Sequence, residues 1–306
     1  MEDALAVFIA SSIRLAMPLI LAASGEVVSE RAGVLNLSLE GMMLTAAFFG
    51  ALGSWATGQP ILGIALAIAA SLALASVQAI LSILLRANQL VVGIGFNILA
   101  LGATTLLYRL IFGGLSREEI PGLGKMSVPG LSDLPFIGPA LFQHSLLVYF
   151  GLACVVGLWA MLKYTGFGLA VRAVGDEPLS ADKAGIPVAR VRFCAVLIAG
   201  VMAGLAGSFL SVADIHTFTE NMTNGAGYLA LAAVIFGGWT ITRAVGACLL
   251  FGAATALQFQ LPAIGVNVPT AALLMLPYVL ALLAVAGVVG RIDPPTALTL
   301  PFLRAR

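Results

Sequence analysis

Long apolar stretches separated by short polar segments run along almost the whole chain. A stretch of about 20 apolar residues can cross the hydrocarbon core of a bilayer, and in lipid only a helix satisfies its own backbone polar groups. The pattern predicts about nine crossings, within a range of about eight to ten, because several stretches are short or contain glycine and proline. The predicted crossings are about Leu5–Ser24, Gly41–Thr57, Ile61–Leu85, Ala87–Tyr108, Ser145–Leu162, Phe193–Ala213, Gly225–Ile241, Ala244–Gln260 and Thr270–Gly290.

Composition supports a membrane protein. Of the 306 residues, 60% are hydrophobic and only 9% are charged, whereas a soluble domain has roughly 25% charged residues. The fold class we expect is therefore all-α, a polytopic helical membrane protein in which residues 1–306 form a single transmembrane domain. The formal net charge of +1 gives no basic field that would favour a nucleic-acid partner.

The distribution of Lys and Arg predicts the orientation. With the amino terminus outside, eleven cations lie on the cytoplasmic side, three lie outside, and Arg14 lies within the first crossing. The cytoplasmic set is Arg31, Arg86, Lys163, Arg172, Lys183, Arg190, Arg192, Arg243, Arg291, Arg304 and Arg306, and the outer set is Arg109, Arg117 and Lys125. The segment Leu110–His144 is then external, and the loop at 163–192 is cytoplasmic.

The cytoplasmic loop contains a short helix that is marked at both ends. Pro178 suits the first helical position, and Asp176 or Glu177 before it can satisfy free N–H donors. Gly185 supplies a left-handed stop, and Pro187 cannot continue the helix. So short a helix is marginal alone, which favours a docking surface. From these local signals, a connector that only orders the loop is an equally good interpretation.

The loop also resembles a known motif. Gly175, Pro178, Ala181, Gly185 and Ile186 are similar to the cytoplasmic coupling loop of permease subunits in bacterial ATP-binding-cassette (ABC) importers, where this helix sits in a groove of the ATPase. The resemblance departs at Asp176-Glu177, where many relatives have a neutral or amide residue. The residues it assigns to ATPase coupling are Glu177, Pro178, Ala181, Asp182, Lys183, Ala184 and Gly185.

A second, more specific resemblance lies near the start of the chain. Ser29–Met43 is similar to the signature of the simple-sugar and nucleoside branch of the branched-chain amino-acid permease superfamily. Gly93–Gly102, Ala232–Trp239 and Leu276–Tyr278 agree with it. Relatives often carry a proline after the Gly237 segment, whereas this chain has Thr240–Arg243 there.

The resemblance implies a permease subunit of an ABC importer in the bacterial inner membrane. ATP and Mg²⁺ would be bound by a separate ATPase chain, because no G-x-x-x-x-G-K-[ST] phosphate loop occurs here. The implied partners are ABC ATPase subunits, a second homologous permease chain, either identical or different, and an extracytoplasmic substrate-binding protein. The implied substrates are nucleosides or related purines first and simple sugars second.

Polar side chains inside the predicted crossings are functional candidates, because an unpaired polar group is costly in lipid. For Gln78, Gln258 and Gln260 we favour hydrogen bonds between helices. Asn36 and Asn97 lie in the matched motifs, so we assign them to the translocation path, where Phe96 could stack on a base.

Two other classes of protein, an ion-coupled transporter and an enzyme, fit the sequence less well. An ion-coupled transporter needs an ionisable relay near the midplane, for which Glu40 and Arg14 are the nearest candidates, although Arg14 could also snorkel or contact the bundle. An enzyme would need clustered catalytic groups, which the sequence lacks. His144 and His216 have no metal-ligand spacing and are expected at the surface or at the membrane interface, so no metal is assigned. The small residues of Gly200–Gly207 predict close helix packing.

Overall fold

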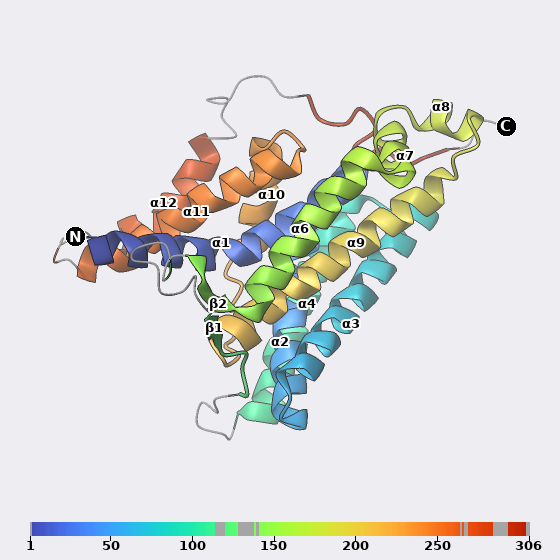
Figure 1. Ribbon diagram of the computed structural model, residues 1–306. Coiled ribbons are helices and arrows are strands. Elements are labelled where there is room, and N and C mark those ends of the chain that lie inside the picture. Colours follow the sequence, from blue (N-terminus) through green and yellow to red (C-terminus); the bar gives the residue numbers. More distant parts are fainter. Residues whose placement is uncertain are drawn as a thin grey trace.

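The computed structural model describes residues 2–113, 120–127, 138, 141–263, 265, 269–283 and 293–303. Its regular structure is almost entirely helical, which confirms the all-α fold class (Figure 1). The elements are α1 (Glu2–Arg31), α2 (Leu39–Thr57), α3 (Pro60–Ala79), the π-helix η1 (Ile80–Leu84), α4 (Gln89–Phe112), β1 (Lys125–Ser127), β2 (Gln143–Ser145), α6 (Leu146–Tyr164), α7 (Gly166–Asp176), α8 (Pro178–Lys183), α9 (Val188–Ser208), the π-helix η2 (Phe209–Asp214), α10 (Ala226–Phe236), α11 (Ile241–Ala263) and α12 (Thr270–Leu283).

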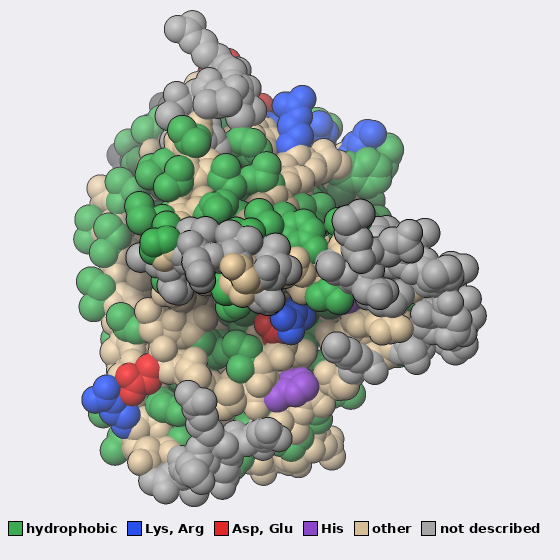
Figure 2. Space-filling view, turned by 90° about the vertical axis from the view of Figure 1, so that its left-hand side faces the viewer, with side chains coloured by type: hydrophobic (Ala, Val, Ile, Leu, Met, Phe, Trp, Pro, Cys, Tyr) green, Lys and Arg blue, Asp and Glu red, His purple; other side chains and the backbone are tan. Residues whose placement is uncertain are grey.

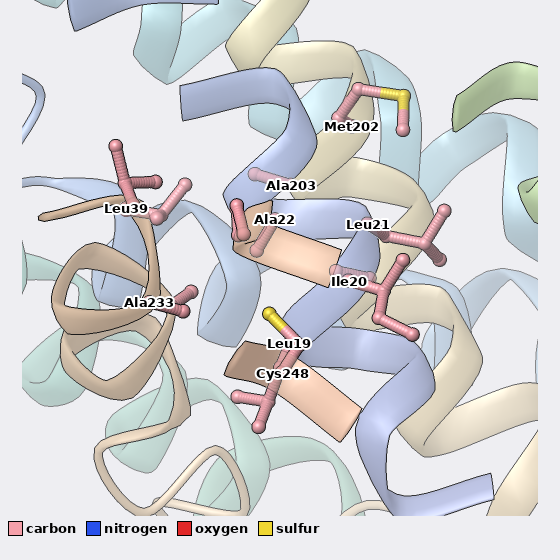
Figure 3. Close-up of a cluster of buried hydrophobic side chains, with 14 of the residues drawn as sticks. Leu19, Ile20, Leu21, Ala22, Leu39, Met202, Ala203, Ala233 and Cys248 are labelled. Atoms are coloured by element: carbon pink, nitrogen blue, oxygen red, sulfur yellow. The ribbon is translucent and has the colours of Figure 1, made fainter. Parts of the chain in front are cut away.

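The core of the bundle is built around α1. This helix packs along α9 and α11, while α2 and α3 pack together and against α9. Figure 3 shows Ala22 of α1 beside Ala203 of α9 and Leu19 of α1 beside Cys248 of α11, in a cluster that also contains Ala233 of α10. All of these side chains are buried, so the helices interlock through small and medium apolar groups.

Glycines permit the closest helix contacts. A Cβ atom at Gly200 would collide with Ala75 of α3, and one at Gly207 would overlap the backbone of Met43 in α2. Small residues let helix backbones approach closely, and in lipid this packing replaces the missing hydrophobic drive between helices. The predicted packing role of Gly200–Gly207 is confirmed.

Several helices are interrupted. Residues 32–38, between α1 and α2, are not helical. The long helices α3 and α9 each end in a π-helical turn, after which Arg86 (φ 58°) and His216 (φ 55°) adopt left-handed backbone conformations. Such π-turns often mark functional positions in helices.

Six of the described helical segments are long and apolar enough to cross a membrane. They are Leu5–Arg31, Pro60–Leu84, Gln89–Phe112, Leu146–Tyr164, Val188–Asp214 and Ile241–Pro262. Helix α10 has only 11 residues, a length of about 16 Å at 1.5 Å per residue, and cannot cross alone. The predicted count of about nine crossings is therefore not confirmed, whereas the multi-pass helical architecture is.

The two ends of the bundle differ. At one end lie α7, α8 and residues 293–303; we call this the α8 end (Figure 1). Nearer the other lies the antiparallel ribbon of β1 and β2, in which Met126 pairs with His144; we call this the ribbon end. Much of the predicted external segment, namely 114–119, 128–137 and 139–140, lies outside the described residues, as do 284–290 of the last predicted crossing.

Candidate functional site

Helix α7 anchors the surface at the α8 end. It begins after Thr165, whose Oγ1 accepts a hydrogen bond from the Gly168 amide at 3.1 Å. Its Val171 and Val174 side chains are fully buried in a cluster that includes Val28 of α1. Burying a valine side chain contributes about 1.5–3 kcal/mol, so α7 is held firmly against the end of α1.

Helix α8 confirms the predicted short helix. It spans Pro178–Lys183, and Gly185 follows with a φ of 85°, the left-handed stop that the sequence indicated. The side chain of Glu177, at the N-cap, makes no capping hydrogen bond. Of the two carboxylates expected to satisfy free donors, Asp176 or Glu177, the second does not do so, and the proline and glycine define the helix ends.

The faces of α8 divide its residues into two groups. Ala181 is only 4% exposed and belongs to the buried cluster with Val171 and Val188. Leu179 is 47% exposed, and Lys183 and Ala184 are exposed beside it. The expectation that Ala181 points towards a partner is thus corrected, because its methyl group packs into the protein itself. Leu179 was missed, although an apolar residue in a polar loop is a readable signal.

The α7–α8 junction is tied to the end of α1. A Cβ at Gly175 would collide with the backbone carbonyl of Arg31, so only glycine allows this approach. The Gly175 carbonyl accepts a hydrogen bond from the Ala297 amide at 2.9 Å, and the Thr299 amide donates to the Gly33 carbonyl at 3.3 Å. The segment 293–303 therefore bridges the coupling loop and the break after α1.

Arg192 of α9 joins the same junction. Its Nε donates to the Ala32 carbonyl at 3.0 Å and its Nη1 donates to the Leu300 carbonyl at 2.8 Å. Between α8 and this terminal segment lies a groove of about 320 Å³, with Pro178 and Phe302 among its lining residues. Helices α1 and α9, the coupling loop and the terminal segment thus form one connected unit.

The break between α1 and α2 encloses Asn36. This side chain is 0% exposed, and its Oδ1 accepts a hydrogen bond from Ser38 Oγ at 2.7 Å. The Asn36 backbone amide donates to Glu26 Oε1 at 2.9 Å, and the same Ser38 hydroxyl, with its single proton, is shared with Gln78 Oε1. The hydrogen bond expected for Gln78 is confirmed. Glu26 was missed, although a carboxylate in an apolar span is a strong signal.

Asn97 of α4 holds three other segments together. Its Oδ1 accepts from the Gly41 amide at 2.8 Å, and its Nδ2 donates to the Leu37 carbonyl and to the Tyr228 hydroxyl, both at 2.8 Å. Its predicted place on the translocation path is untested. The geometry shows that the amide is already engaged by protein groups from α2, α10 and the break.

Two tyrosines extend this contact to an exposed surface. Tyr228 of α10 is 46% exposed and Tyr278 of α12 is 40% exposed, and the Tyr278 hydroxyl donates to the Asn224 carbonyl at 2.8 Å. We call Asn97, Tyr228 and Tyr278 the tyrosine patch. Phe96, the neighbour of Asn97, is half-buried. The patch offers phenol hydroxyls and aromatic faces that are accessible in this chain.

Glu40 caps the short helix α10. Its Oε1 accepts from Thr223 Oγ1 at 2.6 Å and from the Gly225 amide at 2.9 Å, and its Oε2 accepts from the Gly227 amide at 2.6 Å. A carboxylate at a helix N-terminus satisfies free N–H groups and interacts favourably with the helix dipole. Glu40 is therefore engaged by fixed donors and is placed as a capping residue.

Two ion pairs lie away from the α8 end. Arg14 contacts Asp214 at 3.2 Å, which makes Arg14 a bundle contact, one of the two alternatives expected for it. Arg109 donates to both oxygens of Glu220, at 2.7 and 3.2 Å, and this hydrogen bonding lowers the pKa of Glu220 below its ordinary value. Figure 2 shows basic side chains next to acidic ones at two places on one face, below basic groups at the upper edge.

The histidines occupy less exposed positions than predicted. His144 is only 6% exposed, so it is not a surface residue, and its expected position at the membrane interface is untested. His216 is half-buried, and its ring packs directly against Gly122. Among the described residues, no cluster of three His, Cys, Asp or Glu side chains could hold a metal ion.

The fold defines a multi-pass helical membrane protein with long apolar helices around a buried polar junction. The chain belongs to the family described as the branched-chain amino acid transport system / permease component, whose model matches residues 8–285. This membership confirms the predicted superfamily and identifies the chain as a permease.

Named relatives match over most of the chain. It is 37% identical over 315 aligned residues to the guanosine ABC transporter permease protein NupQ of Bacillus subtilis, covering 99% of this chain and 98% of the relative. It is 32% identical to the nucleoside ABC transporter permease protein NupC of Lactococcus lactis, covering 99% of each. It is 40% identical to a protein provisionally named a glucose ABC transporter permease, TsgC13, of Haloferax volcanii, covering 82% of this chain and 76% of the relative. No solved structure matches the chain significantly.

Proposed function

We propose that this chain is the permease subunit of an ATP-driven nucleoside importer in the bacterial inner membrane, with the α8 end in the cytoplasm. The observation that carries the proposal is the exposed face of α8, presented by a unit that is fixed to α1 through Gly175. A rigid helix can transmit the movement of a partner, whereas a flexible loop would absorb it.

The exposed face of α8 is the proposed contact with the ATPase. Leu179 supplies an apolar anchor, Lys183 and Glu177 supply charges at the rim, and Ala184 allows close approach. ATP and Mg²⁺ would be bound by that ATPase chain. Asp182 is half-buried beside this face, while Ala181 and Gly185 hold the helix in position.

Guanosine and related nucleosides are the proposed substrates. The full-length similarity to two permeases named for guanosine and for nucleosides supports this class. The tyrosine patch suits it, because aromatic faces can stack on a base and phenol hydroxyls can exchange hydrogen bonds with a ribose. On this proposal the path passes Phe96 and the tyrosine patch, with Asn97 orienting Tyr228. Asn36 is fully buried, so on this proposal it stabilises the residues behind the path.

Simple sugars are the second candidate. The relative named for glucose is 40% identical, although the match covers a smaller share of both chains. Sugars would use the hydroxyls of the tyrosine patch and make less use of its stacking faces.

A second permease chain and an external substrate-binding protein complete the proposed assembly. The binding protein would contact the ribbon end, across the membrane from the ATPase. The second permease, identical or different, would cover part of the exposed apolar surface, to which α4 contributes Val91, Ile98 and Leu110, each about 70% exposed.

The experiment tests docking and transport separately. We would reconstitute the permease with its partner ATPase, second permease and binding protein, and measure ATP-dependent uptake of labelled guanosine with unlabelled glucose as competitor. Ala184→Trp should abolish co-purification of the ATPase and reduce uptake at least tenfold, while Ala56→Trp, on an exposed residue at the far end of α2, should retain both.

Each result has a defined meaning. Full co-purification with Ala184→Trp would contradict the docking surface. Uptake of glucose but not guanosine would replace the proposed substrate by the second candidate, and uptake that is independent of ATP would contradict the importer.

A further inference from the structure

A basic pocket of about 290 Å³ lies at the α8 end, away from α8 and from the tyrosine patch. It is formed where α1 and α6 end, beside α7 and the turn that leads into α11. Three cations line it, Arg31, Lys163 and Arg172, together with the aromatic rings of Trp159 and Trp239. One wall is the turn at Thr240, where the sequence departs from the family pattern.

The pocket is held in shape by the protein around it. Arg31 Nε donates to the Trp239 carbonyl at 2.8 Å, and the Trp239 indole N–H donates to Glu30, which is buried beneath it. Lys163 Nζ lies 5.0 Å from the centroid of the Trp159 ring. These contacts fix the walls and leave the outer nitrogens of Arg31 without a hydrogen-bond partner among the described residues.

The pocket carries a net positive charge. Among the described residues no carboxylate lines it, although Asp176 attracts Arg31 from outside the wall, and Arg172 and Arg31 repel each other. Arg172 uses its Nε on the Gly168 carbonyl at 3.4 Å, which leaves its terminal nitrogens available. Two guanidinium groups and an ammonium group around one space favour an anion with several oxygen acceptors.

The depth of the pocket indicates where that anion comes from. Arg31 is the last residue of the span Leu5–Arg31, and Lys163 is the last but one of Leu146–Tyr164. Two membrane spans therefore end in cations at the pocket. Tryptophan, tyrosine and lysine at such ends lie at the level of the lipid headgroups, and Leu162 and Ile241 give the pocket an apolar side.

We propose that this pocket binds the phosphate group of an anionic phospholipid from the adjoining leaflet. Arg31 and Arg172 donate to the phosphate oxygens, Lys163 adds charge, and the acyl chains lie along the apolar surface beside Leu162. Basic pockets between membrane helices recognise anionic headgroups in this way. Because Arg31 also contacts Gly175, the bound lipid would brace the junction between α1 and α7.

The test uses the purified full-length permease, delipidated in a neutral detergent, with its tryptophan fluorescence quenched by brominated lipids. Phosphatidylglycerol should bind at least tenfold more tightly than phosphatidylcholine. Lys163→Gln combined with Arg172→Gln should weaken phosphatidylglycerol binding about tenfold to thirtyfold, since each cation near an anionic lipid contributes roughly a factor of five. The matched control, Arg86→Gln with Arg190→Gln, removes two exposed cations outside the pocket and should change binding less than twofold.

Competition separates the sources of the phosphate. Inorganic phosphate at about 10 mM should leave lipid quenching unchanged, because it lacks the apolar contacts. Displacement of the lipid by inorganic phosphate would overturn the proposal in favour of a soluble anion. Equal weakening of phosphatidylglycerol binding in the control pair would also overturn it, because general surface charge would then explain the binding. Thermal unfolding in neutral detergent checks that the variants are folded. If the double variant does not fold, Lys163→Gln alone is used instead, and its affinity for phosphatidylglycerol should fall about fivefold.

Discussion

Replacing Glu40 by glutamine tests how the short helix α10 is held. The carboxylate receives hydrogen bonds from Thr223, Gly225 and Gly227, and Gly225 precedes α10 with a φ of 84°. Glutamine has nearly the same shape but carries a donor in place of one oxygen and has no charge. Its carbonyl oxygen can retain the bonds from Thr223 and Gly225, but its NH₂ group would then face the Gly227 amide.

The magnitude follows from these losses. A hydrogen bond to a charged group contributes about 1.5–3 kcal/mol, and a negative charge at a helix N-terminus contributes about 0.3–1 kcal/mol. Their sum gives a loss of about 3 kcal/mol in the free energy of unfolding, which changes the folding equilibrium by roughly 100-fold. Unfavourable contact between two facing N–H groups would increase this loss.

The assay is equilibrium unfolding of the purified permease in mixed micelles, followed by the fluorescence of its 3 tryptophans. Glu40→Gln should be about 3 kcal/mol less stable than the parent, while Glu177→Gln, on an exposed residue without a capping bond, should be within about 0.5 kcal/mol of it. A Glu40→Gln protein of parental stability that no longer transports would refute the capping argument and identify Glu40 as an ionisable group needed for transport.

Three further predictions follow from the same contacts. Gly175→Ala should reduce substrate-stimulated ATP hydrolysis several-fold while the ATPase still co-purifies, because the new Cβ displaces α7 from the Arg31 carbonyl; unchanged stimulation would contradict the connection. Asn97→Leu should lower the free energy of unfolding by about 2 kcal/mol, from three hydrogen bonds of about 0.6 kcal/mol each in a membrane protein; parental stability with slower transport would favour a direct role in the path. With the native cysteines replaced, a cysteine at Gly124 should react with an impermeant reagent from outside and one at Ser180 should not, and the opposite result would reverse the topology.

Local features were readable from the sequence because their causes are local. Pro178 and Gly185 determine where α8 begins and ends through their own backbone preferences. Glycine spacing on α9 predicted close packing, because a residue without a side chain lets any neighbouring helix approach closely. The family signature was readable for the same reason, since it is a property of consecutive residues.

Features that depend on distant partners could not be predicted. Glu40 caps α10 through groups more than 180 positions along the chain, at Thr223 and Gly227. Ala181 faces inward only because α7 and α9 meet beneath α8. Asn97 was assigned to the translocation path from its motif, whereas its contact with Tyr228 depends on another helix. In each case the contact is decided by the three-dimensional arrangement of helices that are distant in the sequence.

The connections at the α8 end explain how a six-residue helix could act on the whole membrane domain. If α8 were joined to the bundle only by flexible chain, movement of a bound ATPase would be lost in the loop. Here Gly175 lies against the last carbonyl of α1, and Arg192 bonds both to the break after α1 and to Leu300. Because α1 and α9 also pack along each other through the core, α8 cannot be displaced without moving both helices. The terminal segment adds a third attachment through Ala297, so the loop, the two central helices and the end of the chain would move together.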